Sequence, residues 1–111
     1  LLELLPYGYR RLVEVAHAVM ADPVVVMLDE PAAGLSEAEM GKLAHIIRHL
    51  KTQGKCVLLI EHDMDFVNEI VDDVVVLDSG REIYRGDMAG MRQNPAVIAA
   101  YLGIQQDVAH A

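Results

Sequence analysis

The stretch Val24-Val25-Val26-Met27-Leu28-Asp29-Glu30-Pro31 decides the fold of this chain. Its first five residues are apolar and β-branched at the start; Pro23 precedes the stretch and Pro31 ends it. A short apolar run bounded in this way is typical of a parallel strand that is buried on both faces. Successive side chains of a strand point to opposite faces, so Asp29 and Glu30 leave its carboxyl end in different directions. Ligands of open α/β sheets bind beyond that end, so the two carboxylates mark a candidate site.

Two adjacent carboxylates in this position suit nucleotide hydrolysis. One can hold a hydrated Mg²⁺ while its neighbour orients or deprotonates an attacking water. Taken alone, the Asp29-Glu30 pair is equally well explained as a capping and solubility device. The motifs elsewhere in the chain discriminate between these two interpretations.

Length, composition and charge limit the classes of protein to which the chain can belong. The 111 residues make one domain or a piece of a larger one, and 53% hydrophobic content is too high for a disordered chain. The net charge of −8 predicts a solvated acidic surface and speaks against a broad nucleic-acid interface. The longest apolar runs are about five residues, far below the roughly 20 of a membrane span. No signal peptide is recognisable, and the chain opens on Leu1 rather than Met, so Leu1 need not be the natural first residue.

The cysteine and the paired histidines carry little functional signal. Cys56 has no second cysteine with which to form an internal disulfide, and its apolar surroundings predict an inert, buried thiol in a reducing compartment. His45 and His49 are spaced four residues apart on a predicted helix. They lack the glutamate of a His-Glu-x-x-His zinc motif and lie off the apolar face, so we expect no metal there.

Strands and helices alternate through residue 77, which predicts a layered α/β fold with a parallel sheet. Ser36, with Glu39 three residues later, predicts a capping box at the start of the second helix. The other predicted elements follow chain order: a helix through Leu12, Val15, Ala16 and Val19 that ends at Asp22-Pro23; the strand 24–29; the capped helix with Met40, Leu43, Ala44, Ile46, Ile47 and Leu50 on its buried side, ending at Gly54; a strand 56–60; a short helix through Phe66, Val67, Ile70 and Val71; a strand 74–77, turned at Ser79-Gly80 into a hairpin with 82–85; and a last helix from Asn94-Pro95 through Tyr101-Leu102, ended by Gly103.

Two further segments fall beside the carboxylates in the predicted fold. Leu5-Pro6-Tyr7-Gly8-Tyr9 leads into the first helix, and backbone N–H groups at such a helix start bind anions when a glycine permits close approach. His62 ends the second strand, at the same sheet edge as Asp29 and Glu30. Its imidazole can donate a hydrogen bond to a phosphate oxygen or position the base.

In this order and spacing, the motifs resemble the nucleotide-binding subunits of ATP-binding-cassette (ABC) transporters. The family's signature motif corresponds to residues 5–9, its Walker B strand to 24–29, and its switch histidine to His62. Several short stretches of the sequence are similar to those of the branched-chain amino-acid importer ATPases. They are Leu-Pro-Tyr-Gly at 5–8, Leu28-Asp29-Glu30-Pro31-Ala32-Ala33-Gly34-Leu35, Glu61-His62-Asp63-Met64, and Asn94-Pro95 leading to Tyr101-Leu102-Gly103.

The resemblance implies a role for each motif. Asp29 would hold Mg²⁺ through water, Glu30 would polarise the attacking water, and His62 would contact the γ-phosphate of ATP. The signature residues Leu5, Pro6, Tyr7, Gly8 and Tyr9, with the D-loop residues Ala33, Gly34, Leu35 and Ser36, would serve a head-to-tail dimer that closes around two ATP molecules. In the signature segment, Pro6 replaces the usual serine, Tyr7 the first glycine and Tyr9 the glutamine. We therefore expect rearranged phosphate contacts there.

The resemblance covers only the carboxyl-terminal half of such a subunit. No Gly-x-x-x-x-Gly-Lys-Ser/Thr loop, which would cradle the phosphates, occurs in the 111 residues. We therefore predict a partial P-loop NTPase fold, with residues 1–103 as the carboxyl-terminal part of the nucleotide-binding domain and 104–111 as a polar tail. This chain alone is expected to be inactive. In the family, the Walker A strand lies between the strands at 56–60 and 74–77, so we expect open strand edges, an uncovered apolar face, and self-association or exchange of the hairpin between copies.

The expected whole protein is an ATP-hydrolysing importer subunit for branched-chain or related amino acids. It would use ATP and Mg²⁺, pair with a second ATPase subunit and transmembrane permease subunits, bind no nucleic acid, and lie on the cytoplasmic face of a prokaryotic plasma membrane. A soluble ABC ATPase of DNA repair or translation, and a non-catalytic self-associating fragment, remain as alternatives.

Overall fold

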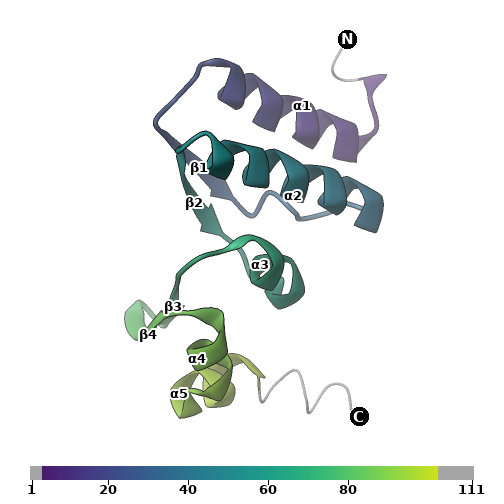
Figure 1. The fold of residues 1–111 in the computed structure, drawn as a ribbon. Helices are drawn as coiled ribbons and strands as arrows, with labels where there is room; N and C mark the ends of the chain where they lie inside the picture. Colours follow the sequence, from purple (N-terminus) through teal and green to yellow (C-terminus); the bar gives the residue numbers. More distant parts are fainter. Residues whose placement is uncertain (1–3, 103–111) are drawn as a thin grey trace. The chain divides into compact units, whose positions relative to one another are not determined.

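The computed structural model describes residues 4–102, with Leu102 described only by its backbone. The chain divides into two compact units, one up to Ile70 and one from Val71 onward (Figure 1). The tail predicted at 104–111 and the helix end predicted at Gly103 lie outside the described residues. No described helix is long and apolar enough to cross a bilayer.

The first unit alternates helices with two parallel strands. Its elements are α1 (Tyr7–Met20), β1 (Val25–Asp29), α2 (Glu37–Thr52), β2 (Cys56–Ile60) and α3 (Met64–Ile70). The strands pair in parallel from Val25 opposite Cys56 to Asp29 opposite Ile60, so their carboxyl ends meet at one edge. The parallel pairing and the order of elements predicted for this unit are confirmed.

The core of this unit lies on one side of the β1–β2 pair. α1 and α2 run side by side there, and α2 also packs on β2 and α3. The buried apolar side chains of the unit are Val15, Val26, Leu28, Ala32, Leu43, Ala44, Ile47, Leu50, Phe66, Val67 and Ile70. They come from every element except β2, and α2 contributes the largest share.

The prediction that β1 is buried on both faces is wrong. Its residues alternate between buried and exposed, because helices cover only one face of the strand pair. Val25, Met27, Leu58 and Ile60 form the uncovered apolar face and are each more than half exposed. The uncovered face itself was expected from the sequence. The prediction that Cys56 is buried is also wrong, because this residue opens β2 opposite Val25 and is exposed.

α2 begins with the capping box that its sequence predicts. The Ser36 hydroxyl oxygen accepts from the Glu39 N–H at 3.2 Å, and a Glu39 carboxylate oxygen accepts from the Ser36 N–H at 3.0 Å. These bonds to Ser36 favour the charged carboxylate and hold the pKa of Glu39 below its usual value. The helix ends before Gly54, whose φ of +76° suits a residue without a side chain.

The second unit contains the predicted hairpin. β3 (Val74–Asp78) pairs antiparallel with β4 (Arg81–Gly86) through the two-residue turn Ser79-Gly80, where both φ angles are positive. Such a turn matches the twist of the strands it joins. Among the described residues, β3 pairs with β4 alone, which fits the open strand edges expected where the family's Walker A strand would lie.

The carboxyl-terminal helical region is more divided than predicted. A helix that the sequence reading missed, α4 (Met88–Gln93), precedes α5 (Pro95–Val97), and a π-helical segment (Ile98–Leu102) replaces the end of the predicted single helix. Asp87 accepts from the Gly90 N–H to cap α4, and Asn94 accepts from two N–H groups to cap α5. α4 was missed because six residues are too few for a helical repeat to be recognised.

Candidate active site

The candidate site lies where β1 and β2 end. Asp29 is the last residue of β1 and stands opposite Ile60. The next residue, Glu30, donates its backbone N–H to the Ile60 carbonyl at 2.8 Å, which extends the pairing by one bond. The segments that carry Glu30 and His62 therefore leave the sheet side by side.

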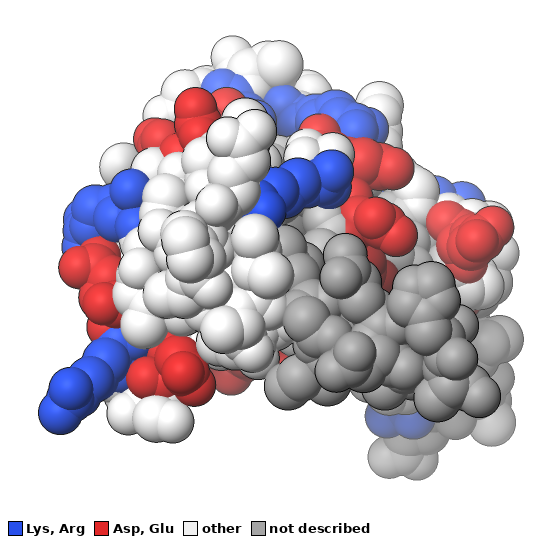
Figure 2. Space-filling model, turned by 90° about the horizontal axis from the view of Figure 1, so that it is seen from below, with Lys and Arg blue, Asp and Glu red and all other residues white. Residues whose placement is uncertain are grey.

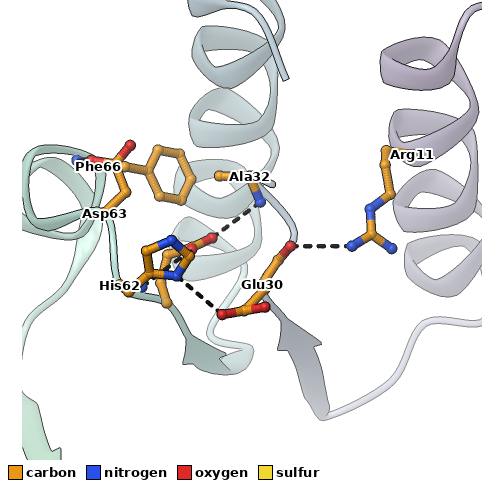
Figure 3. A network of polar contacts seen from close by, with 7 residues as sticks. Arg11, Glu30, Ala32, His62, Asp63 and Phe66 are labelled. Carbon is orange, nitrogen blue, oxygen red and sulfur yellow. Dashed lines mark hydrogen bonds and ion pairs between the residues drawn. The ribbon is translucent and has the colours of Figure 1, made fainter. Parts of the chain in front are cut away.

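The structure brings Glu30 and His62 together. His62 Nδ1 lies 3.0 Å from Glu30 Oε1, and both side chains are open to solvent (Figure 3). Glu30 adopts a φ of +46°, a conformation that non-glycine residues rarely use and that often marks functional positions. A carboxylate and an imidazole in contact can together orient a water molecule and exchange a proton with it.

Arg11 of α1 holds the same segment from the other side. Its Nη2 donates to the Glu30 carbonyl oxygen at 3.1 Å. The guanidinium also lies 6.0 Å from the centre of the Tyr7 ring and 3.7 Å from a Glu14 carboxylate oxygen. Sequence reasoning missed Arg11, because nothing local marks an arginine on a helix as a partner of a backbone carbonyl 19 residues away.

Glu61 is the second residue of the site that sequence reasoning did not single out. Its carboxylate accepts from the Ala32 N–H at 3.0 Å and from the His62 N–H at 3.2 Å. Its side chain is only 1% exposed. The one local signal was a charged residue placed between the apolar strand and His62. Asp63, the residue after His62, caps α3 by accepting from the Phe66 N–H at 3.1 Å.

Asp29 is exposed at the end of β1, next to Glu30. Among residues 4–102 there is no group of three His, Cys, Asp or Glu side chains arranged to hold a metal ion. A single exposed carboxylate such as that of Asp29 is a donor that suits Mg²⁺, because this ion usually keeps several water ligands.

The predicted signature segment and D-loop lie against each other. A Cβ built on Gly34, which has a φ of +77°, would stand 2.8 Å from a Tyr7 ring carbon, so this ring packs on the loop backbone. A Cβ on Gly8 would stand 1.5 Å from a Glu39 carboxylate oxygen, so Gly8 leaves room for the capping box of α2. Pro6 precedes α1 without a side-chain cap. Leu5 and Tyr9 are exposed, and Lys42 lies 5.0 Å from the centre of the Tyr9 ring.

The remaining D-loop residues are placed around the start of α2. Ala33 donates its N–H to the Glu30 carbonyl at 3.2 Å, and Leu35 donates to the Ala32 carbonyl at 3.1 Å. These bonds make a tight turn between β1 and the Ser36 cap. The predicted dimer-facing loop 33–36 therefore begins three residues after the candidate catalytic residue Glu30.

Comparison with known proteins places these features in a family. No family model matches the chain. The high-affinity branched-chain amino acid transport ATP-binding protein BraF of Pseudomonas aeruginosa is 45% identical over 100 residues, which cover 89% of this chain and 39% of that protein. The corresponding protein LivG of Escherichia coli is 42% identical over 100 residues, which again cover 89% of this chain and 39% of that protein. The chain thus spans about two fifths of the length of these curated relatives.

Solved structures agree with the sequence matches. An ATP-binding cassette of an ABC transporter in its ADP conformation superposes with a TM-score of 0.79 at 30% identity, covering 90% of this chain and 41% of that one. The protein cbiO1 of Clostridium perfringens, part of an ABC transporter complex, gives a TM-score of 0.72 at 28% identity, covering 88% of this chain and 39% of that one.

The fold is that of part of an ABC-type ATP-binding cassette. More narrowly, the chain is a homologue of the ATP-binding proteins of branched-chain amino-acid transport. The resemblance inferred from the sequence is confirmed at both levels.

Proposed function

We propose that this chain carries the hydrolytic residues of an ATPase subunit that drives an ABC importer. The observation that carries the proposal is the 3.0 Å contact between His62 Nδ1 and Glu30 Oε1 at the carboxyl edge of two parallel strands. It is supported by the 45% sequence identity to a transport ATP-binding protein in an alignment that covers 89% of the chain.

In this proposal Glu30 polarises the attacking water and His62 donates to the γ-phosphate. Asp29 would hold Mg²⁺ through water, and a bound ion would supply positive charge against the phosphates. The chain's own part is to hold a base and a hydrogen-bond donor at fixed separation. Phosphoryl transfer depends chiefly on such positioning and on charge stabilisation.

Residues 5–9 and 33–36 serve a different nucleotide in the proposal, namely the ATP held by a second ATPase subunit. The packing of the Tyr7 ring on Gly34 supports this assignment, because it joins the two segments into one surface. The exposed Tyr9 beside Lys42 supplies an aromatic ring and a cation near the same helix start. The phosphate cradle comes from the portion of the cassette that this chain does not span.

We further propose that the whole protein works with transmembrane permease subunits on the cytoplasmic face of a prokaryotic plasma membrane. The amino-acid assignment follows relatives at 42–45% identity, but a ribose import ATP-binding protein of Rhizobium etli is 40% identical over 84% of the chain. The importer class is therefore better supported than the substrate. On the face drawn in Figure 2, Asp and Glu side chains lie beside Lys and Arg side chains, and the net charge of −8 favours transport over a nucleic-acid role.

The test of this function is ATP hydrolysis by the longer protein, assembled with its permease subunits in proteoliposomes. Turnover is expected to rise when a binding protein loaded with a branched-chain amino acid is added, and to stay at its basal value with a ribose-loaded binding protein. Stimulation by ribose alone would keep the importer class and overturn the amino-acid assignment. No hydrolysis in any assembly would overturn the ATPase itself.

The uncovered face of the β1–β2 pair supports a second proposal, that the 111-residue chain self-associates. Val25, Met27, Leu58 and Ile60 expose an apolar surface on strands that have no further partner among the described residues. Apolar faces and open strand edges of this kind attract other chains.

Leu58→Lys is expected to weaken this association at least about tenfold, because it places a charge in the contact. Sedimentation velocity over a range of concentrations measures the effect. Met20→Lys is the matched control, since Met20 is apolar and 83% exposed but is the last residue of α1 and belongs to neither strand. A wild-type chain that stays monomeric and melts in one sharp transition would contradict the proposal.

A further inference from the structure

Glu61 is an acidic residue whose carboxylate is withdrawn from solvent although it lies in a loop. Its side chain is 1% exposed, whereas the neighbouring His62 side chain is 72% exposed. A buried carboxylate is costly unless it is hydrogen-bonded or paired with a cation. Glu61 must therefore contribute something that an apolar residue would not.

Its two oxygen atoms bind two different segments. Oε2 accepts from the backbone N–H of Ala32, which follows β1, and Oε1 accepts from the backbone N–H of His62, which follows β2. Hydrogen bonds to an ionised acceptor are stronger than those between neutral groups. The Glu61 carboxylate thus ties together the two loops that carry the candidate catalytic pair.

The loop after β1 needs such a restraint. Glu30 has a φ of +46°, which persists only where the surroundings hold it. Its N–H donates to the Ile60 carbonyl. Its carbonyl oxygen accepts from Arg11 (Figure 3). Glu61 restrains the same loop two residues further on, by accepting from the Ala32 N–H, and it restrains the second loop by accepting from the His62 N–H.

We propose that Glu61 is a positioning residue that sets the distance between the Glu30 carboxylate and the His62 ring. It acts through the backbone N–H groups of Ala32 and His62. Its role in hydrolysis rests on the proposed function, whereas the structural restraint does not. Apart from the contacts of Glu61, the two loops are linked in residues 4–102 by the Glu30–Ile60 backbone hydrogen bond and by the exposed contact between Glu30 and His62.

The first test uses the 111-residue chain and needs no ATP. Glu61→Gln keeps the shape of the side chain, but its amide nitrogen is a donor and cannot accept from an N–H group. Hydrogen exchange followed by NMR is expected to quicken at least about tenfold at the Ala32 or His62 amide, with the amides inside α2 unchanged. Glu69→Gln is the matched control, because Glu69 is a glutamate of α3 with an exposed side chain.

Unchanged exchange at both amides would overturn the restraint. Should Glu61→Gln lose the dispersed amide spectrum of the folded chain, Glu61→Asp takes its place. The shorter aspartate keeps the charge but cannot span both N–H groups, so one of the two amides is still expected to exchange faster. Slow exchange at both amides in a folded Glu61→Asp chain would equally overturn the restraint.

The second test uses the longer ATPase. Glu61→Gln is expected to lower kcat at least about tenfold while KM for ATP changes less than about twofold, because positioning of the water is lost and nucleotide binding is not. Glu61→Asp should recover part of kcat, and Glu69→Gln should leave both constants unchanged. Faster exchange together with normal kcat would overturn the positioning role. A parallel loss of kcat and of thermal stability in all Glu61 variants would also overturn it, because Glu61 would then act only by stabilising the fold. A wild-type protein without ATPase activity would instead defeat the proposed function, while the exchange result would still decide the restraint.

Discussion

Glu30→Gln is expected to suppress steady-state ATP turnover of the longer protein by about 10²- to 10⁴-fold, the usual contribution of a positioned base. Glutamine occupies the same volume, and its carbonyl oxygen can still accept from His62 Nδ1, which lies 3.0 Å from the present carboxylate oxygen. The amide cannot accept a proton from water. ATP binding should therefore persist while hydrolysis fails.

Two measurements make this result decisive. ATP binding by equilibrium dialysis should be within about twofold of the wild-type protein, which separates lost chemistry from lost binding. Glu69→Gln, which also removes one carboxylate from the first unit but at an exposed position on α3, should hydrolyse ATP normally. Near-normal turnover in the Glu30 variant would remove Glu30 from its proposed role and leave the 3.0 Å contact as a structural one.

Leu43→Ala is expected to give the largest loss of stability, about 2–5 kcal/mol in the free energy of unfolding. Leu43 lies in α2 with 0% exposure, and its neighbours on the same helix face, Ala44, Ile47 and Leu50, are 1–2% exposed. α2 packs on α1, β2 and α3, so a cavity in its face loosens contacts with the whole first unit. Urea unfolding followed by circular dichroism, at one fixed chain concentration, measures the change.

Met20→Ala serves as the control for this effect. Met20 is the last residue of α1 and is 83% exposed, so its truncation removes few contacts and should change the free energy of unfolding by less than about 0.5 kcal/mol. Equal losses for the two variants would mean that the first unit is not stabilised by the packed face of α2.

The residues that could be placed from the sequence share a local cause. The capping box needs only Ser36 and Glu39, and the hairpin needs only a two-residue turn between β-branched strands, so both were predicted and both are confirmed. Asp29, Glu30 and His62 were brought to one edge by the general rule that parallel strands end on the same side. Their chemical roles stay predictions.

The misassigned features depend instead on what packs against a segment. Nothing within residues 24–31 or 56–60 states that helices cover only one face of their sheet, so burial of β1 and of Cys56 was overestimated. Burial is a property of the neighbours of a segment, which a local pattern does not contain.

The sequence by itself therefore determined the kinds of element in the first unit, their order, and the edge at which the candidate site lies, because hydrophobic periodicity, caps and turns act over a few residues. Only the tertiary structure decided that Arg11 holds the Glu30 carbonyl and that the buried Glu61 carboxylate bridges Ala32 and His62. The hydrogen bonds from Arg11 to Glu30 and from Ala32 to Glu61 join residues 19 and 29 positions apart. Such partners are selected by the path of the folded backbone, and no spacing along the chain encodes them.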